Sequence, residues 1–125
     1  NNYRFVRYAD VLLLYAEALN ALGQTTQAYP FVDKVRQRAG LRTLSTAMPG
    51  LSQQQFLTQL KHERITELSG EGHRWEDLAR WNELSPALAS RDQAFANFKT
   101  GKHELLPIPQ FDIDNNPNLK QNPGY

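Results

Sequence analysis

The sequence predicts an all-α fold, in which a tetratricopeptide-like helical hairpin is followed by two further helices and an extended, proline-rich C-terminal tail. Before the tail, apolar residues recur at steps of three and four, which is the spacing of a helix face. Four of the seven prolines fall in residues 104–125, which predicts an extended, turn-rich segment there. No segment shows a convincing strand pattern. We expect one domain over residues 1–125, with the hairpin at 7–40, a helical pair at 52–85 and the tail at 104–125.

The composition indicates an ordinary globular domain. The 125 residues are 40% hydrophobic and carry a net charge of +1, whereas a nucleic-acid-binding protein needs a concentrated basic surface. The absence of cysteine excludes disulfides, thiolate zinc sites and cysteine nucleophiles. Because the chain opens almost directly on a helical pattern, we expect it to be a fragment of a longer protein.

The hairpin is predicted from two amphipathic segments, at about residues 7–22 and 25–38, followed by Gly23 and Gly40 at the places of C-terminal caps. The residues expected on the core faces of these two helices are Leu12, Tyr15, Ala16, Leu19, Leu22, Ala28, Phe31, Val32 and Val35. The order small, large, glycine, small, large of a tetratricopeptide unit is matched by Ala16, Leu19, Gly23, Ala28 and Val32. Such a unit needs neighbours to bury its outer faces.

The helical pair is predicted to begin at Ser52, because Ser52 and Gln55 have the spacing of a capping box. Gly70 and Gly72 mark a sharp bend, where glycine supplies a positive φ. The second helix of the pair is expected to end near Leu84. The apolar residues expected to face the core are Phe56, Leu57, Leu60, Ile65, Leu68, Trp75, Leu78 and Trp81.

Two patterns suggest metal binding, and neither is complete. His62 and Glu63 begin the zinc-protease motif H-E-x-x-H, but Thr66 stands in place of the second histidine. We therefore interpret this segment as a solvated helix face that carries His62, Glu63 and Glu67. The tail segment DIDNNP begins like a calcium loop but has Pro117 where the loop needs glycine, so turns are the better interpretation. We expect no metal site and no cofactor.

The stretch SGEGHRWEDLARW, residues 69–81, concentrates reactive residue types. Glu71 and Asp77 could form a glycosidase pair, and the flat rings of Trp75 and Trp81 could stack on sugars. Trp75, Leu78 and Trp81 recur at helical spacing, which is more typical of a packed core stripe with a charged flank. We expect no catalytic residue here; a hydrolase would lose activity on Glu71→Gln or Asp77→Asn.

Four segments in order are RYADVLLLYAEALNALG, VDKVRQRAGL, HERITELSGEGHRWEDLARW and ELLPIPQFDIDNNPNLKQNPGY. Together they resemble the C-terminal portion of the SusD/RagB family. The residues expected to form the structural signature of that family are Glu63, Arg64, Glu67, Glu71, Gly72, Arg74, Trp75, Asp77, Leu78, Arg80 and Trp81.

The resemblance implies a mostly helical protein, several-fold longer than this chain and without catalytic residues. It implies an outer-membrane lipoprotein, lipid-anchored and facing the cell surface. Such a protein binds a glycan or oligosaccharide and passes it to a TonB-dependent transporter. Ligand contacts in the family come largely from other parts of the chain, so no ligand-binding residue is assigned here. The alternative is a protein–protein interaction module of tetratricopeptide type.

Overall fold

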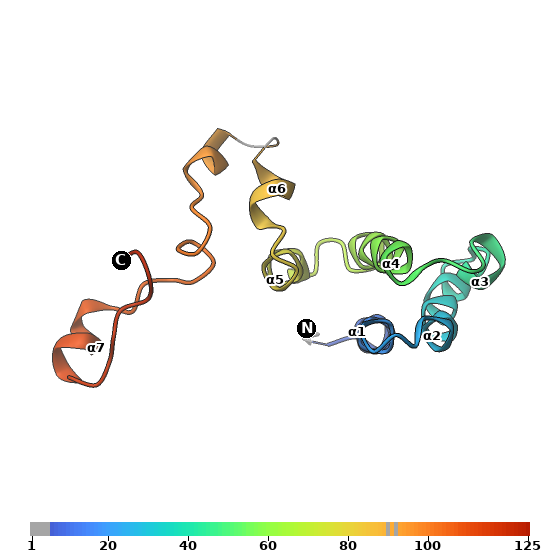
Figure 1. The fold of residues 1–125 in the computed structure, drawn as a ribbon, viewed down its shortest axis with the longest axis horizontal. Helices are drawn as coiled ribbons and strands as arrows, with labels where there is room; N and C mark the ends of the chain where they lie inside the picture. The colour runs from blue at the N-terminus through green and yellow to red at the C-terminus, as the bar shows by residue number, and fades with distance from the viewer. Residues whose placement is uncertain (1–5, 90, 92) are drawn as a thin grey trace, which may run out of the picture. The chain divides into compact units, whose positions relative to one another are not determined.

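A computed structural model describes residues 6–89, 91 and 93–125, and every regular element in these residues is a helix (Figure 1). The helices are α1 (Tyr8–Ala21), α2 (Thr25–Arg38), α3 (Leu44–Ala47), α4 (Gln53–Glu67), α5 (His73–Arg80), α6 (Leu84–Leu88), the 3₁₀ helix η1 (Gln93–Asn97) and α7 (Gln110–Asn115). The predicted all-α fold is confirmed. The chain divides into two compact units, Asn1–His73 (unit 1) and Arg74–Tyr125 (unit 2).

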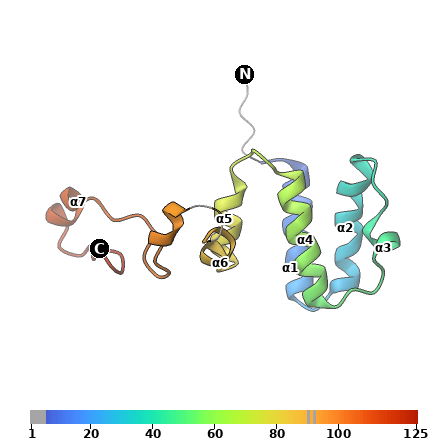
Figure 2. The same ribbon diagram turned by 90° about the horizontal axis from the view of Figure 1, so that it is seen from above.

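Helices α1 and α2 lie side by side and run antiparallel, joined by a turn at Gly23 (Figure 2). The end of α1 is a Schellman turn, in which Gln24 N–H donates to Leu19 O (2.9 Å) and Gly23 N–H to Asn20 O (3.0 Å). Gly23 has a φ of 77°, which residues with a Cβ rarely adopt. The helix end predicted at Gly23 is confirmed, and the tetratricopeptide character of the hairpin stays a prediction.

The core of unit 1 lies between α1, α2 and α4. Ala16 of α1 and Ala28 of α2 are fully buried, and their small side chains let the two helices approach closely. The ring of Tyr29 packs against Phe56 of α4, with the ring centroids 5.0 Å apart. The buried apolar residues of this core are Leu12, Leu13, Ala16, Leu19, Ala28, Tyr29, Val32, Val35, Leu44, Phe56 and Leu60.

The expectation of burial is wrong at Tyr15, Leu22 and Ile65, which are 51%, 75% and 42% exposed. Tyr15 and Leu22 lie at the edge of the predicted α1 stripe, whereas the arc of α1 that joins the core of unit 1 contains the fully buried Ala16. Ile65 points away from the core, because the inner face of α4 at this level is occupied by the buried charged residues Glu63 and Arg64.

The hydroxyl group of Tyr29 on α2 holds the end of the link between α2 and α4. Tyr29 Oη donates to Met48 O (2.9 Å) and accepts from Leu51 N–H (3.0 Å). The chain then enters α4 through the predicted capping box, which is confirmed. Ser52 Oγ accepts from Gln55 N–H (3.3 Å), and Gln55 Oε1 accepts from Ser52 N–H (3.0 Å).

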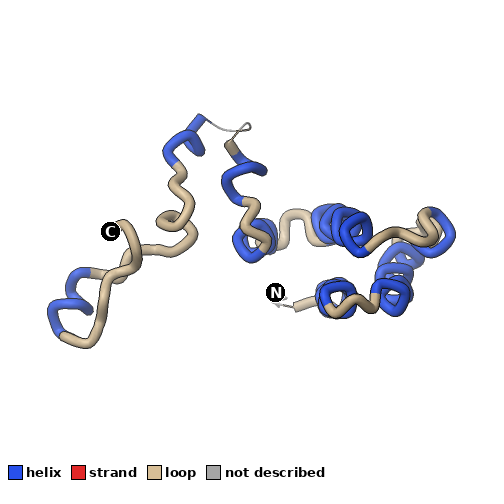
Figure 3. Tube along the Cα trace, in the orientation of Figure 1, coloured by secondary structure: helices blue, strands red, loops and turns tan. Residues whose placement is uncertain are grey.

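Unit 2 consists of short helices joined by loops (Figure 3). Helix α5 ends at Arg80, and a separate helix begins at Leu84, so the prediction of one helix reaching Leu84 is wrong. The interruption occurs because Asn82 adopts a left-handed φ of 56°. Glu83 N–H then donates to Leu78 O (2.8 Å), which closes a Schellman turn with asparagine in the place of glycine.

The tail contains the short helix α7, whereas the sequence predicts it to be extended throughout. Pro109 precedes α7, where the missing N–H of proline has no cost, and Gln110 Nε2 donates to Asp114 Oδ1 (2.8 Å) along the helix. The rest of the tail folds back on itself. The amide of Gln121 bonds both the N–H and the carbonyl of Ile108, at 2.8 and 2.9 Å.

Candidate functional site

The predicted signature begins with carboxylates at every fourth residue, Glu63 and Glu67 on α4 and Glu71 beyond it. This spacing puts Glu63 and Glu67 on one face of the helix. Carboxylates near a helix C-terminus oppose the helix dipole, so neighbouring cations are needed. Three arginines from outside α4 supply them, namely Arg7, Arg36 and Arg38.

Glu63 is buried, so the interpretation of it as part of a solvated face is wrong. Its carboxylate accepts hydrogen bonds from the guanidinium of Arg36 on α2 and from Gln59 Nε2 (2.7 Å). Arg36 Nε also donates to Arg42 O (2.7 Å). Glu63 therefore anchors α4 to α2 and to the start of the α2–α4 link, while its neighbour His62 is exposed.

Arg7 holds the start of α1 to the end of α4. Its Nη1 donates to Glu67 Oε1 (2.9 Å), its Nη2 to Glu67 O (2.8 Å) and its Nε to Glu71 Oε2 (2.7 Å). The hydrogen bonds to Glu71 and then to Glu67 raise the pKa of the Arg7 guanidinium. Arg38 of α2 also donates to Glu67, so both ends of the hairpin meet at one carboxylate. Gly72, with a φ of 88°, forms the predicted bend.

A buried ion pair joins α4 to α1. Arg64 Nη1 lies 2.9 Å from Asp10 Oδ1, and the two side chains are 2% and 8% exposed. Two charges removed from water must satisfy each other, because an unpaired buried charge is strongly destabilising. The pair therefore fixes where α4 lies along α1.

Helix α5 of unit 2 carries the second half of the signature. Asp77 is buried, and its Oδ1 accepts from Arg80 Nε (3.1 Å) and Nη2 (2.9 Å). The guanidinium carbon of Arg80 lies 4.6 Å from the ring centroid of Trp81, within the range of a cation–π interaction. Leu78 is buried as expected, and Arg74 is exposed.

The two tryptophans are less buried than the sequence predicts. Trp75 is 42% exposed and Trp81 is half-buried. The Trp75 ring lies at the edge of a small aromatic cluster, 6.4 Å from Phe95 and 6.3 Å from Phe98 between centroids. Phe98 also contacts the ring of His103 at 5.7 Å. The prediction of a buried Trp75 is wrong because these half-buried rings shield only part of the indole.

The candidate hydrolase carboxylates are engaged in ion pairs, Glu71 with Arg7 and Asp77 with Arg80. Such contacts suit a carboxylate that holds structure together. Among residues 6–89, 91 and 93–125, no group of three or more His, Cys, Asp or Glu could hold a metal ion. In the same residues, no helix has the length and apolar character needed to cross a bilayer.

No motif in the sequence indicates the partners of the signature, which are Arg7, Arg36, Arg38 and Asp10. One signal was present, since acids at every fourth residue predict a row of cations on whatever element faces them. Spacing within one helix does not reveal which element that is, and all four partners belong to the preceding hairpin.

A family model described as the SusD family matches residues 1–125. SusD-like protein P25 of Formosa agariphila is 36% identical over 95% of this chain, which covers 24% of that protein. SusD-like protein P2 of the same organism is 36% identical over 99% of this chain, which covers 26% of it. The chain thus spans about a quarter of the length of these curated relatives.

Solved structures give the same result at the level of the fold. A SusD homolog from Bacteroides thetaiotaomicron is 38% identical with a TM-score of 0.84, over 98% of this chain and 27% of that one. A SusD superfamily protein from Bacteroides vulgatus is 33% identical with a TM-score of 0.86, over 99% of this chain and 28% of that one. The helices and ion pairs described above are therefore those of a chain that belongs to the SusD family.

Proposed function

We propose that residues 1–125 are the C-terminal scaffold of a longer outer-membrane lipoprotein that binds a glycan or oligosaccharide. In this proposal the protein is lipid-anchored, faces the cell surface and works with a TonB-dependent transporter in polysaccharide uptake. The observation that carries the proposal is the match to the SusD family over the whole chain, which nevertheless spans only about a quarter of its relatives.

The polar contacts support a scaffold role. Glu63, Glu67 and Asp77 have little exposed side-chain surface, and arginines bind all three. Carboxylates held in this way fix helices in place and are poorly suited to proton transfer during a reaction. The protein is therefore proposed to bind its ligand without turnover and without a cofactor.

The binding function is tested by isothermal titration of the full-length protein against a panel of oligosaccharides. We expect saturable binding of at least one oligosaccharide. After the titration, the sample should contain no shorter oligosaccharides produced by cleavage. Variant H62A, at an exposed position on α4, should bind as tightly as the native protein. Release of new reducing ends that disappears in E71Q or D77N would establish a hydrolase and contradict the proposal.

The partner and the location need separate measurements. Metabolic labelling with a fatty acid should modify the full-length protein, and protease added to intact cells should degrade it. A TonB-dependent transporter should co-purify from detergent-solubilised outer membranes. Recovery of the protein only from the soluble fraction, without lipid, would contradict the proposed anchoring.

A further inference from the structure

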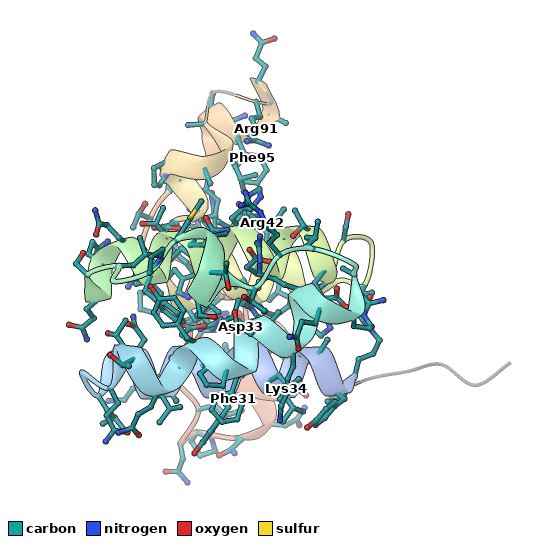
Figure 4. The ribbon with its side chains drawn as sticks, turned by 90° about the vertical axis from the view of Figure 1, so that its right-hand side faces the viewer. Phe31, Asp33, Lys34, Arg42, Arg91 and Phe95 are labelled. Carbon is teal, nitrogen blue, oxygen red and sulfur yellow. The ribbon has the colours of Figure 1, made fainter. Side chains whose placement is uncertain are left out.

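Unit 2 carries a small hollow with aromatic walls. The hollow has a volume of about 200 Å³, and its lining consists of Ala94, Phe95, Asn97, Phe98 and His103. The side chain of Phe95, on η1, is shown in Figure 4. The rings of Phe95 and Phe98 are inclined by 28° with their centroids 5.8 Å apart, and both are only half-buried. Accessible aromatic faces of this kind offer a surface on which another ring can stack.

One hydrogen bond fixes the tautomer of His103. Lys99 N–H donates to His103 Nδ1 (2.9 Å), so Nδ1 is the acceptor nitrogen of a neutral imidazole and the proton is on Nε2. In the part of the chain that the structure describes, no acceptor receives a hydrogen bond from this Nε2–H. The imidazole is half-buried and lines the hollow, so its Nε2–H is available to a ligand.

The second polar group of the hollow is the amide of Asn97. Its side chain is exposed and, among residues 6–89, 91 and 93–125, makes no hydrogen bond to another residue. An amide both donates and accepts, so it can bind a hydroxyl group in either sense. None of the lining residues carries a formal charge while His103 is neutral. The hollow therefore suits a neutral ligand that has both an apolar face and hydroxyl groups.

The loop that carries His103 is held by hydrogen bonds of its own. Lys99 O accepts from the backbone N–H of Lys102 (3.1 Å) and of His103 (3.0 Å). Glu104 Oε1 accepts from Gly101 N–H (3.0 Å). A group that is positioned before its ligand arrives loses less conformational entropy on binding. The donor of His103 is therefore preorganised.

We infer that this hollow binds one neutral pyranose ring of a glycan. The C–H groups on one face of the sugar pack against the rings of Phe95 and Phe98, and a sugar hydroxyl accepts a hydrogen bond from His103 Nε2. The volume is smaller than that of pockets for drug-sized ligands, so it suits a single ring. This inference rests on the proposed function, because it adds a glycan contact in a part of the protein where none is assigned.

Trp75 can report on the hollow without lining it. Its ring lies 6.4 Å from Phe95 and 6.3 Å from Phe98 between centroids, and it is 42% exposed. The full-length protein is labelled with fluorotryptophan, and W75F assigns the fluorine NMR signal of Trp75. The probes are the methyl pyranosides of glucose, galactose and mannose. We expect at least one of them to shift the signal with a Kd of about 1 mM, whereas the open-chain polyol mannitol should not.

Two substitutions test the two kinds of contact. H103N keeps an acceptor in place of Nδ1 but lacks the donor at Nε2, and F95L keeps an apolar side chain but lacks the aromatic face. Each should weaken binding of the glycoside at least about fivefold. The matched controls are H62N on α4 and F111L on α7, which change exposed residues that do not line the hollow and should leave the affinity unchanged.

Two results would overturn the inference. One is that no glycoside shifts the Trp75 signal, and the other is that H103N or F95L binds the glycoside as tightly as the native protein. Isothermal titration of the native protein with the oligosaccharide panel reports on the proposed function separately. Binding of an oligosaccharide without a response of Trp75 would overturn only the inference about the hollow, whereas a failure of every oligosaccharide to bind would contradict the proposed function.

Discussion

At the scale of single residues, the guanidinium of Arg7 connects the start of α1 with both the end of α4 and the turn that follows it. Three of its nitrogen atoms donate in different directions, to two carboxylates and one backbone carbonyl. A lysine ammonium carries the same charge but lacks this planar arrangement of donors. The identity of the residue therefore matters beyond its charge.

The substitution R7K should lower the free energy of unfolding by roughly 1 kcal/mol, because it loses the forked hydrogen bonds of a partly buried arginine. The midpoint of urea denaturation measures this change. R42K, at an exposed position, is the matched control and should leave the midpoint unchanged. An equal effect of the two substitutions would show that the geometry of Arg7 is unimportant.

The buried pair of Asp10 and Arg64 should behave differently, since neither charge can return to water. D10N alone or R64M alone should each cost about 3 kcal/mol, because each leaves its former partner buried without its counter-charge. The double variant should cost clearly less than the sum of the two. A double-mutant cycle from urea denaturation gives the coupling, and strict additivity would mean that the two groups do not interact.

At the scale of elements, the helices of this chain end where local hydrogen bonding specifies an end. The Schellman turn at Gly23 and the capping box at Ser52 are set by residues within one helical turn. Asn82 ends α5 by the same mechanism, with a φ of 56°. The end of α5 is thus encoded as locally as the end of α1, although by a less common residue.

Asn82 offers a test with two substitutions at one site. N82G should be as stable as the native chain or slightly more stable, because glycine adopts a positive φ without strain. N82A should lower stability by about 1 kcal/mol, since alanine is strained in the left-handed region. Thermal unfolding measures both. A more stable N82A would indicate that α5 can continue through this position.

Local signals explain how much of the architecture could be predicted from the sequence. The C-terminal end of α1 and the start of α4 follow from Gly23 and Ser52, and the all-α class follows from apolar spacing. The exposure of Tyr15 could not be predicted, because spacing shows that a face is apolar but not whether something covers it. The burial of Glu63 was missed for a related reason, since its partner Arg36 lies on another helix.

At the scale of the whole molecule, the two units differ in how much they bury. Unit 1 has a continuous apolar core shared by α1, α2 and α4. In unit 2, η1 and α7 contain no buried residue. The side-chain amides of α7 make short-range hydrogen bonds within the helix, from Gln110 to Asp114 and from Asn115 to the carbonyl of Phe111.

Hydrogen exchange should reveal this difference. In the 125-residue chain, amides in the middle of α1 and α4 should exchange at least about a hundredfold more slowly than those of α7, because amides without buried packing open locally at low cost. Mass spectrometry of peptic peptides gives the rates. Equal protection of α4 and α7 would show that the tail is stabilised by contacts other than those described.

Glu67 has a consequence for the topology of the hairpin. The turn at Gly23 joins α1 and α2 covalently at one end, and Arg7 and Arg38 bind the same carboxylate at the other. The hairpin is therefore closed into a ring by two ion pairs to Glu67, which reduces the conformational entropy that fraying ends would gain. Glu67 thus acts as a reversible crosslink, in a chain with no cysteine to form a permanent one.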